Sequence, residues 1–235
     1  MSSQTESPRP QQRAAPVAHD DPSAPGSTAN RGSTLVFAGD SITDAGRDRA
    51  IRLSLGDGYV KLIADALHGR GLTVVNQGVS GDRAVDLERR WRDVLAADPD
   101  VLTVYIGVND MWRRFDAGDA TSAAEFQNTT AGLLEAAVAT GVEHIILIEP
   151  FFLPVREEQV AWLDDLDPKR EAIESLAARF GASHVALQER MTAAAAEHGI
   201  AAIAPDGVHP APRGSALIAD AWLTAYSEIE EPARG

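Results

Sequence analysis

Four short segments of this chain carry residue types that could do chemistry. They are residues 39–43 (GDSIT), 76–82 (NQGVSGD), 107–110 (GVND) and 206–210 (DGVHP). Ser41 could supply a hydroxyl nucleophile, while Gly78 and Asn109 could donate hydrogen bonds to an oxyanion. His209 could act as a base, with Asp206 as the carboxylate that orients it. Together these groups are the equipment of acyl transfer through a serine ester, provided that the fold brings the segments together.

Each segment alone also has an ordinary structural interpretation. Gly-Asp-Ser can be a turn with a helix cap, and Asp-x-x-His can be a surface turn. Gly78 can be an ordinary glycine at a strand end, and Asn109 can form an Asx turn. We favour the catalytic interpretation because all four segments occur in one chain and fall where predicted strands or loops end.

The elements that must position these residues follow from the hydrophobic pattern. Short apolar runs alternate with longer segments of helical period, which indicates a parallel sheet covered by helices on both faces. The predicted strands are 34–38, 73–76, 101–106, 144–148 and 184–186. The predicted helices are 58–68, 83–97, 122–139, 168–180, 189–198 and 213–228. Ser41, Gly78 and Asn109 follow the first three strands, at the sheet edge where open α/β folds bind ligands.

Local signals refine the helix ends. Ser122 is a candidate helix cap, and Asp167 with Pro168 predicts a helix that starts at residue 168. Gly141 and Gly181 follow predicted helix ends. Residues 150–167 have the least periodic pattern, so we expect a lid or a wall of the substrate pocket there.

Composition indicates one domain behind a long tail. The chain has 235 residues, 44% of them hydrophobic, which is enough for one substantial core. Residues 1–32 are rich in Pro, Ser, Gln and Ala, so we predict a disordered tail there and the domain at 33–235. The chain shows no secretory-signal pattern and no run of roughly 18 apolar residues, so we expect a soluble cytoplasmic protein.

Charge and residue types narrow the partners. The net charge of -14 argues against nucleic acid and anionic membranes as partners and favours a neutral substrate. The chain has no cysteine, and its remaining histidines have no partner at a spacing typical of a metal site. We therefore expect neither a metal nor a cofactor.

The four segments resemble those of the SGNH hydrolases, the GDSL esterase/lipase superfamily, over about residues 34–226. The resemblance implies a flavodoxin-like three-layer α/β/α sandwich with a five-stranded parallel sheet. It implies that Ser41 is the nucleophile, and that its own N–H, Gly78 and Asn109 form the oxyanion hole. It also implies that His209 is the base and Asp206 its partner.

A closer resemblance concerns the substrate. Residues 46–48 (GRD), 55–60 (LGDGYV), 79–82 (VSGD) and 107–116 (GVNDMWRRFD) are similar to bacterial carbohydrate esterases of the acetylxylan-esterase type. This implies removal of short acyl groups, acetyl above all, from esters such as acetylated xylo-oligosaccharides. Pro205 stands where those relatives often carry an aromatic residue, which changes the pocket wall beside Asp206.

Further residues beside the four segments could contact the substrate. Asp40 is one candidate, and the others are the aromatic residues Trp112, Phe151 and Phe152, each of which could equally belong to the core. The partner we expect is a small-molecule or oligosaccharide ester, and the chain could form a homo-oligomer.

Two other functions compete with this interpretation. The same catalytic residues would serve a lysophospholipase or an acyl thioesterase, which act on longer chains. An inactive sugar-binding module could also keep the fold. The intact set of candidate catalytic residues argues against the inactive module, but the sequence separates the enzyme classes poorly because pocket length depends on packing.

Overall fold

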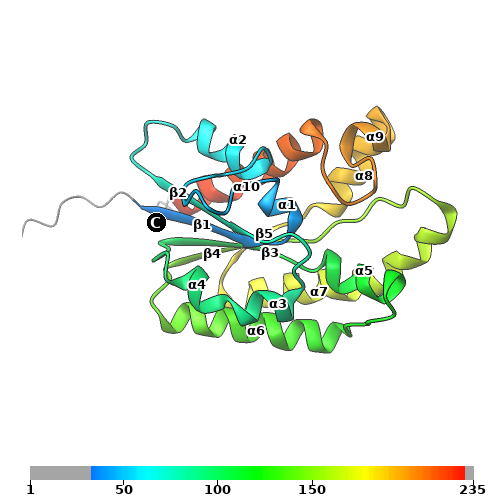
Figure 1. Cartoon of the computed structure of the whole chain (residues 1–235), viewed down its shortest axis with the longest axis horizontal. Coiled ribbons are helices and arrows are strands. Elements are labelled where there is room, and N and C mark those ends of the chain that lie inside the picture. Colours follow the sequence, from blue (N-terminus) through cyan, green and yellow to red (C-terminus); the bar gives the residue numbers. More distant parts are fainter. Residues whose placement is uncertain (1–32, 231–235) are drawn as a thin grey trace, which may run out of the picture. The chain divides into compact units, whose positions relative to one another are not determined.

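A computed structural model of the chain describes residues 33–230. Within that range the strands form one parallel sheet in the order β2-β1-β3-β4-β5 (Figure 1). The strands are β1 (Thr34–Gly39), β2 (Thr73–Gly78), β3 (Val101–Tyr105), β4 (His144–Ile148) and β5 (Ser183–Val185). The predicted fold class and all five predicted strands are confirmed. The disordered tail predicted for residues 1–32 lies outside the described residues.

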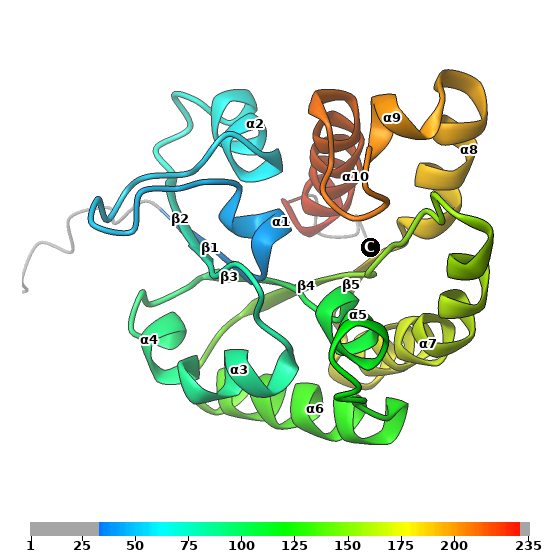
Figure 2. The same ribbon diagram turned by 45° about the vertical axis from the view of Figure 1, so that its right-hand side comes forward.

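Helices cover both faces of this sheet, as Figure 2 shows. One face packs against α2 and α10, and the other against α3, α4, α6 and α7. The helices are α1 (Ser41–Asp44), α2 (Tyr59–Ala66), α3 (Ala84–Arg89), α4 (Trp91–Leu95), α5 (Val108–Asp116), α6 (Ala123–Ala139), α7 (Leu163–Phe180), α8 (Gln188–His198), α9 (Ile200–Ile203) and α10 (Pro212–Glu230), with a 3-10 helix η1 (Glu157–Trp162) before α7.

The sheet is buried on both sides because its strands are apolar on both sides. Along β1, Leu35 and Phe37 face one core cluster, whereas Val36 and Ala38 face the other. Successive strand residues point to opposite faces, so a continuous apolar run is what a doubly covered strand requires. Fully buried Trp222 of α10 donates from Nε1 to Thr103 Oγ1 at 2.8 Å, which satisfies its one polar group.

The strand order places the candidate site. The chain runs from β1 outward to β2 and then back to β3 on the other side of β1. At such a switch point the loops leave the sheet in opposite directions, and the crevice between them is where α/β proteins bind ligands. The segment after β1 contains Ser41 and therefore opens into this crevice.

Several helices differ from the sequence-based expectation. The helix predicted at 83–97 is broken into α3 and α4 at Arg90, whose backbone lies at φ -113° and ψ 11°. The short helices α1 and α9 were not predicted. Nor was α5, because most of its nine residues are polar or charged. Its buried face contains Val108 and Met111.

The segment expected to be a lid is largely helical. Residues 157–167 belong to η1 and to the start of α7, which begins at Leu163 rather than at Pro168. Burial of Leu166 holds this first turn against the core, although Pro168 removes one helical hydrogen bond. Among the described residues, no helix combines the length and the apolar character needed to span a bilayer.

Candidate active site

Three side chains from distant segments form one hydrogen-bonded chain. Ser41 Oγ lies 2.9 Å from His209 Nε2, and His209 Nδ1 lies 2.6 Å from Asp206 Oδ2. When the Asp206 carboxylate accepts the Nδ1 proton, the lone pair of Nε2 faces the serine hydroxyl. This is the geometry in which an imidazole can remove the proton of a serine.

Local packing fixes the position of Ser41. Asp40 caps α1, because its Oδ1 accepts a hydrogen bond from the backbone N–H of Ile42 at 3.0 Å. Gly39 ends β1 so close to Thr43 and to the carbonyl of Tyr105 that any side chain would clash. Ser41 is consequently the first residue of α1, and its own N–H has no intrahelical partner.

The base and its carboxylate belong to a tight turn between α9 and α10. Asp206 Oδ1 accepts hydrogen bonds from the backbone N–H groups of Val208, at 3.0 Å, and His209, at 2.7 Å. Gly207 lies at φ +88° and packs against the carbonyl of Leu153, where no other residue would fit. Burial raises the pKa of Asp206, but these hydrogen bonds and the one from His209 outweigh it and leave the pKa below its usual value.

Asn109 lies in the first turn of α5, with its side chain beside the loop that follows β2. Its Nδ2 donates to the backbone carbonyl of Asp82 at 2.9 Å. The neighbouring Asp110 accepts from the N–H of Ala84 at 3.0 Å and ties α5 to the start of α3. One amide N–H of Asn109 donates to the Asp82 carbonyl, so the other can donate to a ligand oxygen.

Gly78 is not available as an oxyanion donor, which corrects the prediction. Its N–H donates to Asn76 Oδ1 at 2.8 Å, while Asn76 Nδ2 donates to the carbonyls of Thr43, at 2.6 Å, and Leu55, at 2.7 Å. A side chain at Gly78 would collide with the backbone of Asp44. Gly78 therefore lets α1 pack against β2, which is a structural role.

The sequence analysis did not single out Gly81, which lies three residues further along the same segment. In the loop after β2, the N–H of Val79 donates to Gly39, that of Ser80 to Asp44 Oδ2, and that of Asp82 to Val79. The N–H of Gly81, at φ +87°, forms no hydrogen bond within residues 33–230. Nothing in the sequence distinguishes this glycine from Gly78, because the difference lies in which side chains turn back onto the loop.

Three of the four predicted substrate contacts are wrong. Asp40 is buried beneath Ser41, and its exposed fraction is 1%. Phe151 and Phe152 are equally buried, at 0% and 1%, because the segment after β4 passes under the turn that holds His209. Trp112 remains a candidate substrate contact, since its ring lies beside that of His209 with centroids 6.3 Å apart.

Burial of Asp40 predicts a pH-dependent stability. Burial raises the pKa of Asp40 from 3.8 to about 7, against the lowering effect of the Ile42 N–H. The folded state thus holds the proton more tightly than the unfolded state, so the Asp40 contribution is complete below pH 3.8 and declines as the pH rises towards 7. Urea unfolding should show Asp40→Asn gaining stability relative to wild type as the pH rises from about 5 to about 8. If the difference in unfolding free energy between Asp40→Asn and wild type does not change with pH, the raised pKa of Asp40 is contradicted.

A small pocket of about 230 Å³ adjoins the serine and the histidine. Its lining consists of Ser41, Ile42, Ala45, Asp57, Gly58, His209, Pro210 and Ser215. The Asp57 carboxylate forms no hydrogen bond or ion pair within the described part of the chain, although its backbone N–H is bonded to Ala45. Like Gly81, Asp57 was not among the site residues that the sequence analysis singled out.

Comparison with known proteins identifies the class. Residues 37–217 match the model of the GDSL-like lipase/acylhydrolase family. The chain belongs to this family and is a carboxylic ester hydrolase with the SGNH hydrolase fold.

Particular relatives share most of the chain. It is 32% identical over 204 residues to an acetylxylan esterase of Geobacillus stearothermophilus, covering 82% of this chain and 93% of that one. The structure of an alpha/beta hydrolase enzyme from the metagenome of Lake Arreo, Spain, matches with a TM-score of 0.77 at 36% identity, covering 83% and 95%. A variant of a Geobacillus acetyl-xylooligosaccharide esterase matches with a TM-score of 0.74 at 32% identity, covering 83% and 95%.

Proposed function

We propose that this protein is a serine esterase that removes short acyl groups, in particular acetyl, from hydroxyl groups of carbohydrates. The observation that carries the proposal is the continuous hydrogen-bonded chain from Ser41 through His209 to Asp206. The acetylxylan esterase relatives support the choice of substrate class.

The proposed reaction proceeds through an acyl-enzyme. His209 Nε2 accepts the Ser41 proton as Oγ bonds to the carbonyl carbon of the ester, and the carbonyl electron pair moves onto oxygen. The carbon–oxygen bond to the sugar then breaks, and His209 returns the proton to the departing sugar oxygen. A water molecule repeats the addition with His209 as base, and the acid leaves as Ser41 regains its proton.

Three donors are proposed for the oxyanion of this reaction. They are the backbone N–H groups of Ser41 and Gly81 and the side-chain amide of Asn109. Each has an N–H that the described residues leave unused, and the three come from adjoining segments at one sheet edge. Fixed donors of this kind stabilise the negative charge only once it develops, which lowers the barrier rather than tightening substrate binding.

The size of the pocket favours a short acyl group. A volume of about 230 Å³ is below the roughly 300–1,000 Å³ of pockets that enclose drug-sized ligands. Several of its lining residues are small or polar, such as Ala45, Gly58 and Ser215, whereas a fatty acyl chain needs a long apolar channel. A lysophospholipase or long-chain thioesterase is therefore the weaker alternative.

A series of p-nitrophenyl esters from acetate to octanoate tests the chain-length preference. We expect kcat/KM to be highest for acetate and to fall by at least about tenfold at octanoate, because each extra methylene finds no apolar wall to cover it. A preference for octanoate would favour the lysophospholipase or thioesterase alternative. Wild-type protein that hydrolyses none of the esters would favour the inactive binding module.

Asp57 supplies a test of the carbohydrate part of the proposal. An unpaired carboxylate in the pocket is an acceptor suited to sugar hydroxyl groups. We expect Asp57→Ala to raise KM for acetylated xylo-oligosaccharides by about 10-fold, the value of one lost charged hydrogen bond, and to leave p-nitrophenyl acetate unaffected. Asp220→Ala, a change on the exposed surface of α10, is the matched control. Equal loss on both substrates would assign Asp57 to the catalytic chemistry instead.

A further inference from the structure

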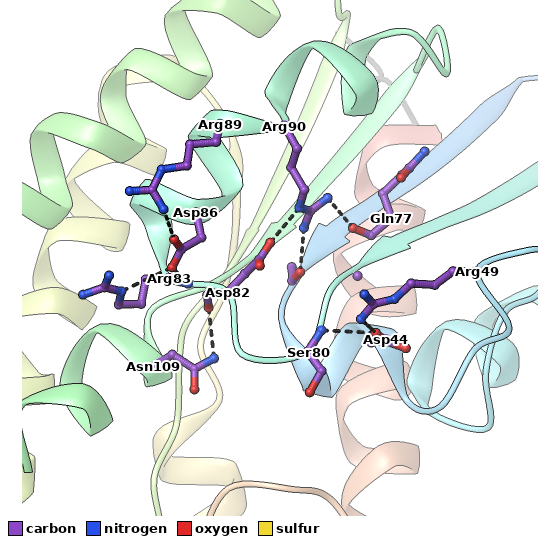
Figure 3. Close-up of polar contacts among 12 residues, drawn as sticks. Asp44, Arg49, Gln77, Ser80, Asp82, Arg83, Asp86, Arg89, Arg90 and Asn109 are labelled. Atoms are coloured by element: carbon purple, nitrogen blue, oxygen red, sulfur yellow. Dashed lines mark hydrogen bonds and ion pairs between the residues drawn. The ribbon is translucent and has the colours of Figure 1, made fainter. Parts of the chain in front are cut away.

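One guanidinium group joins two of the segments that carry the proposed oxyanion donors and reaches the third, that of Asn109, through Asp82. Arg90 Nη2 donates to the carbonyl of Gly39 at 3.0 Å, and Nη1 donates to the carbonyl of Gln77 at 2.7 Å. Its Nε donates to Asp82 Oδ2 at 2.6 Å. Figure 3 shows Arg90 reaching from the break between α3 and α4 toward the ends of the strands, with Asp82 between it and Asn109.

Each acceptor of Arg90 lies within a few residues of a donor or binds one. Gly39 is two residues before Ser41 at the end of β1. Gln77 is the penultimate residue of β2, from which the loop with the Gly81 N–H departs. The backbone carbonyl of Asp82 is the acceptor that orients the Asn109 amide. A single planar side chain thus contacts the segments of Ser41 and Gly81 directly and is connected to the Asn109 amide through Asp82.

The environment makes these contacts strong. The Arg90 side chain is 19% exposed and that of Asp82 is 11% exposed, so solvent screens the ion pair little. Burial raises the pKa of Asp82, and the hydrogen bond and charge of Arg90 oppose that rise. The planar fork of arginine can serve three acceptors at once, whereas a lysine ammonium acts as a point charge.

The break between α3 and α4 occurs at this same residue. Arg90 ends α3 and precedes α4, with a backbone conformation outside the helical range. The residue before it, Arg89, is exposed and pairs with Asp86, whereas the residue after it, Trp91, is buried in the core. In an unbroken helix the directions of the Arg89, Arg90 and Trp91 side chains would be fixed relative to one another. The break lets the Arg90 side chain point toward the strand ends.

We propose that Arg90 is a positioning residue for the oxyanion hole, which holds the Ser41, Gly81 and Asn109 donors at their mutual distances. Arg90 bonds to two backbone carbonyl groups and to the Asp82 carboxylate, and it acts only through the donors. The inference rests on the proposed esterase function. Donors displaced by even about 1 Å lose much of their effect on a transition state, and the substrate still binds.

Steady-state kinetics with p-nitrophenyl acetate test this inference. We expect Arg90→Met to lower kcat by about 10- to 100-fold while KM changes by less than about threefold, and Arg90→Lys to recover only part of the loss. Arg90→Ala should regain activity on addition of millimolar guanidinium ion, which can occupy the vacated position. Arg89→Met, which removes the adjacent exposed arginine, should keep wild-type kcat and show no response to guanidinium.

The outcomes separate the possible explanations. A near-normal kcat in folded Arg90→Met would overturn the positioning role. This includes the case in which the substitution lowers only the thermal stability of the protein. If Arg90→Met does not fold, the other two variants decide the matter. A normal kcat in Arg90→Lys, together with no response of Arg90→Ala to guanidinium ion, would contradict the inference. A wild-type protein that hydrolyses no ester would instead defeat the proposed function itself.

Discussion

Replacing Ser41 with alanine should lower kcat for p-nitrophenyl acetate by about 10⁴- to 10⁶-fold, the range seen when a serine hydrolase loses its nucleophile. The Ser41 hydroxyl is the only group of the hydrogen-bonded chain that can form the acyl bond in the proposed reaction. The hydroxyl lies beside an open pocket, so its removal should change the free energy of unfolding by less than about 0.5 kcal/mol.

A second serine provides the control for this experiment. Ser80 lies in the loop after β2, and its side chain is exposed. Ser80→Ala keeps the backbone N–H that binds Asp44, so its turnover should stay near that of wild type. Turnover by Ser41→Ala within about tenfold of wild type would remove the serine from the mechanism.

Replacing Asn109 with alanine should lower kcat by about 10²- to 10³-fold, the usual cost of one oxyanion donor, with KM nearly unchanged. The reason is that the amide meets the carbonyl oxygen as its charge develops, so the interaction is made in the transition state. The same change leaves the carbonyl of Asp82 without its donor, at a cost in stability of about 1–3 kcal/mol.

Measurements of folding and kinetics together separate these two effects of Asn109. Thermal unfolding shows whether the variant is folded at the assay temperature, and kcat then reports on the oxyanion alone. Asn128→Ala, on the exposed side of α6, is the matched control and should leave both quantities unchanged. Folded Asn109→Ala with near-normal kcat would contradict the assignment.

Much of the fold could be predicted because its signals are local. A strand such as β1 is a continuous apolar run, and such a run buried on both faces indicates a parallel sheet. Ser41 and Asn109 follow strand ends, so the pattern alone predicted that they would meet at one edge. His209 and Asp206 were found from their spacing, and in the structure His209 lies within hydrogen-bonding distance of both Asp206 and Ser41.

The parts that could not be predicted depend on contacts between distant segments. Gly78 and Gly81 look equivalent in sequence, and only the return of the Asn76 side chain onto the Gly78 N–H separates them. Phe152 follows a strand on the catalytic side, yet it packs inward, where its ring stacks on that of Trp162 with centroids 5.5 Å apart. The apolar pattern does not predict whether the side chain of a residue after the strand points into the core or into the site.

Arg90 is the clearest case of this limit. In the sequence it is one of four arginines among residues 83–92, a stretch with the period of an ordinary surface helix. Its role follows from three acceptors that come from β1, β2 and the loop after β2. A helix break at one residue has no strong local signal when neither glycine nor proline is present.

The central claim is that an acyl-enzyme forms on Ser41, and covalent labelling with diethyl p-nitrophenyl phosphate tests it most directly. The reagent transfers its phosphoryl group to an activated serine and leaves a stable ester. We predict one phosphoryl group per chain, located on Ser41 by peptide mass spectrometry, with activity lost in proportion to labelling and no label on Ser41→Ala. Inhibition with the label on another residue, or full activity with Ser41 labelled, would contradict the account.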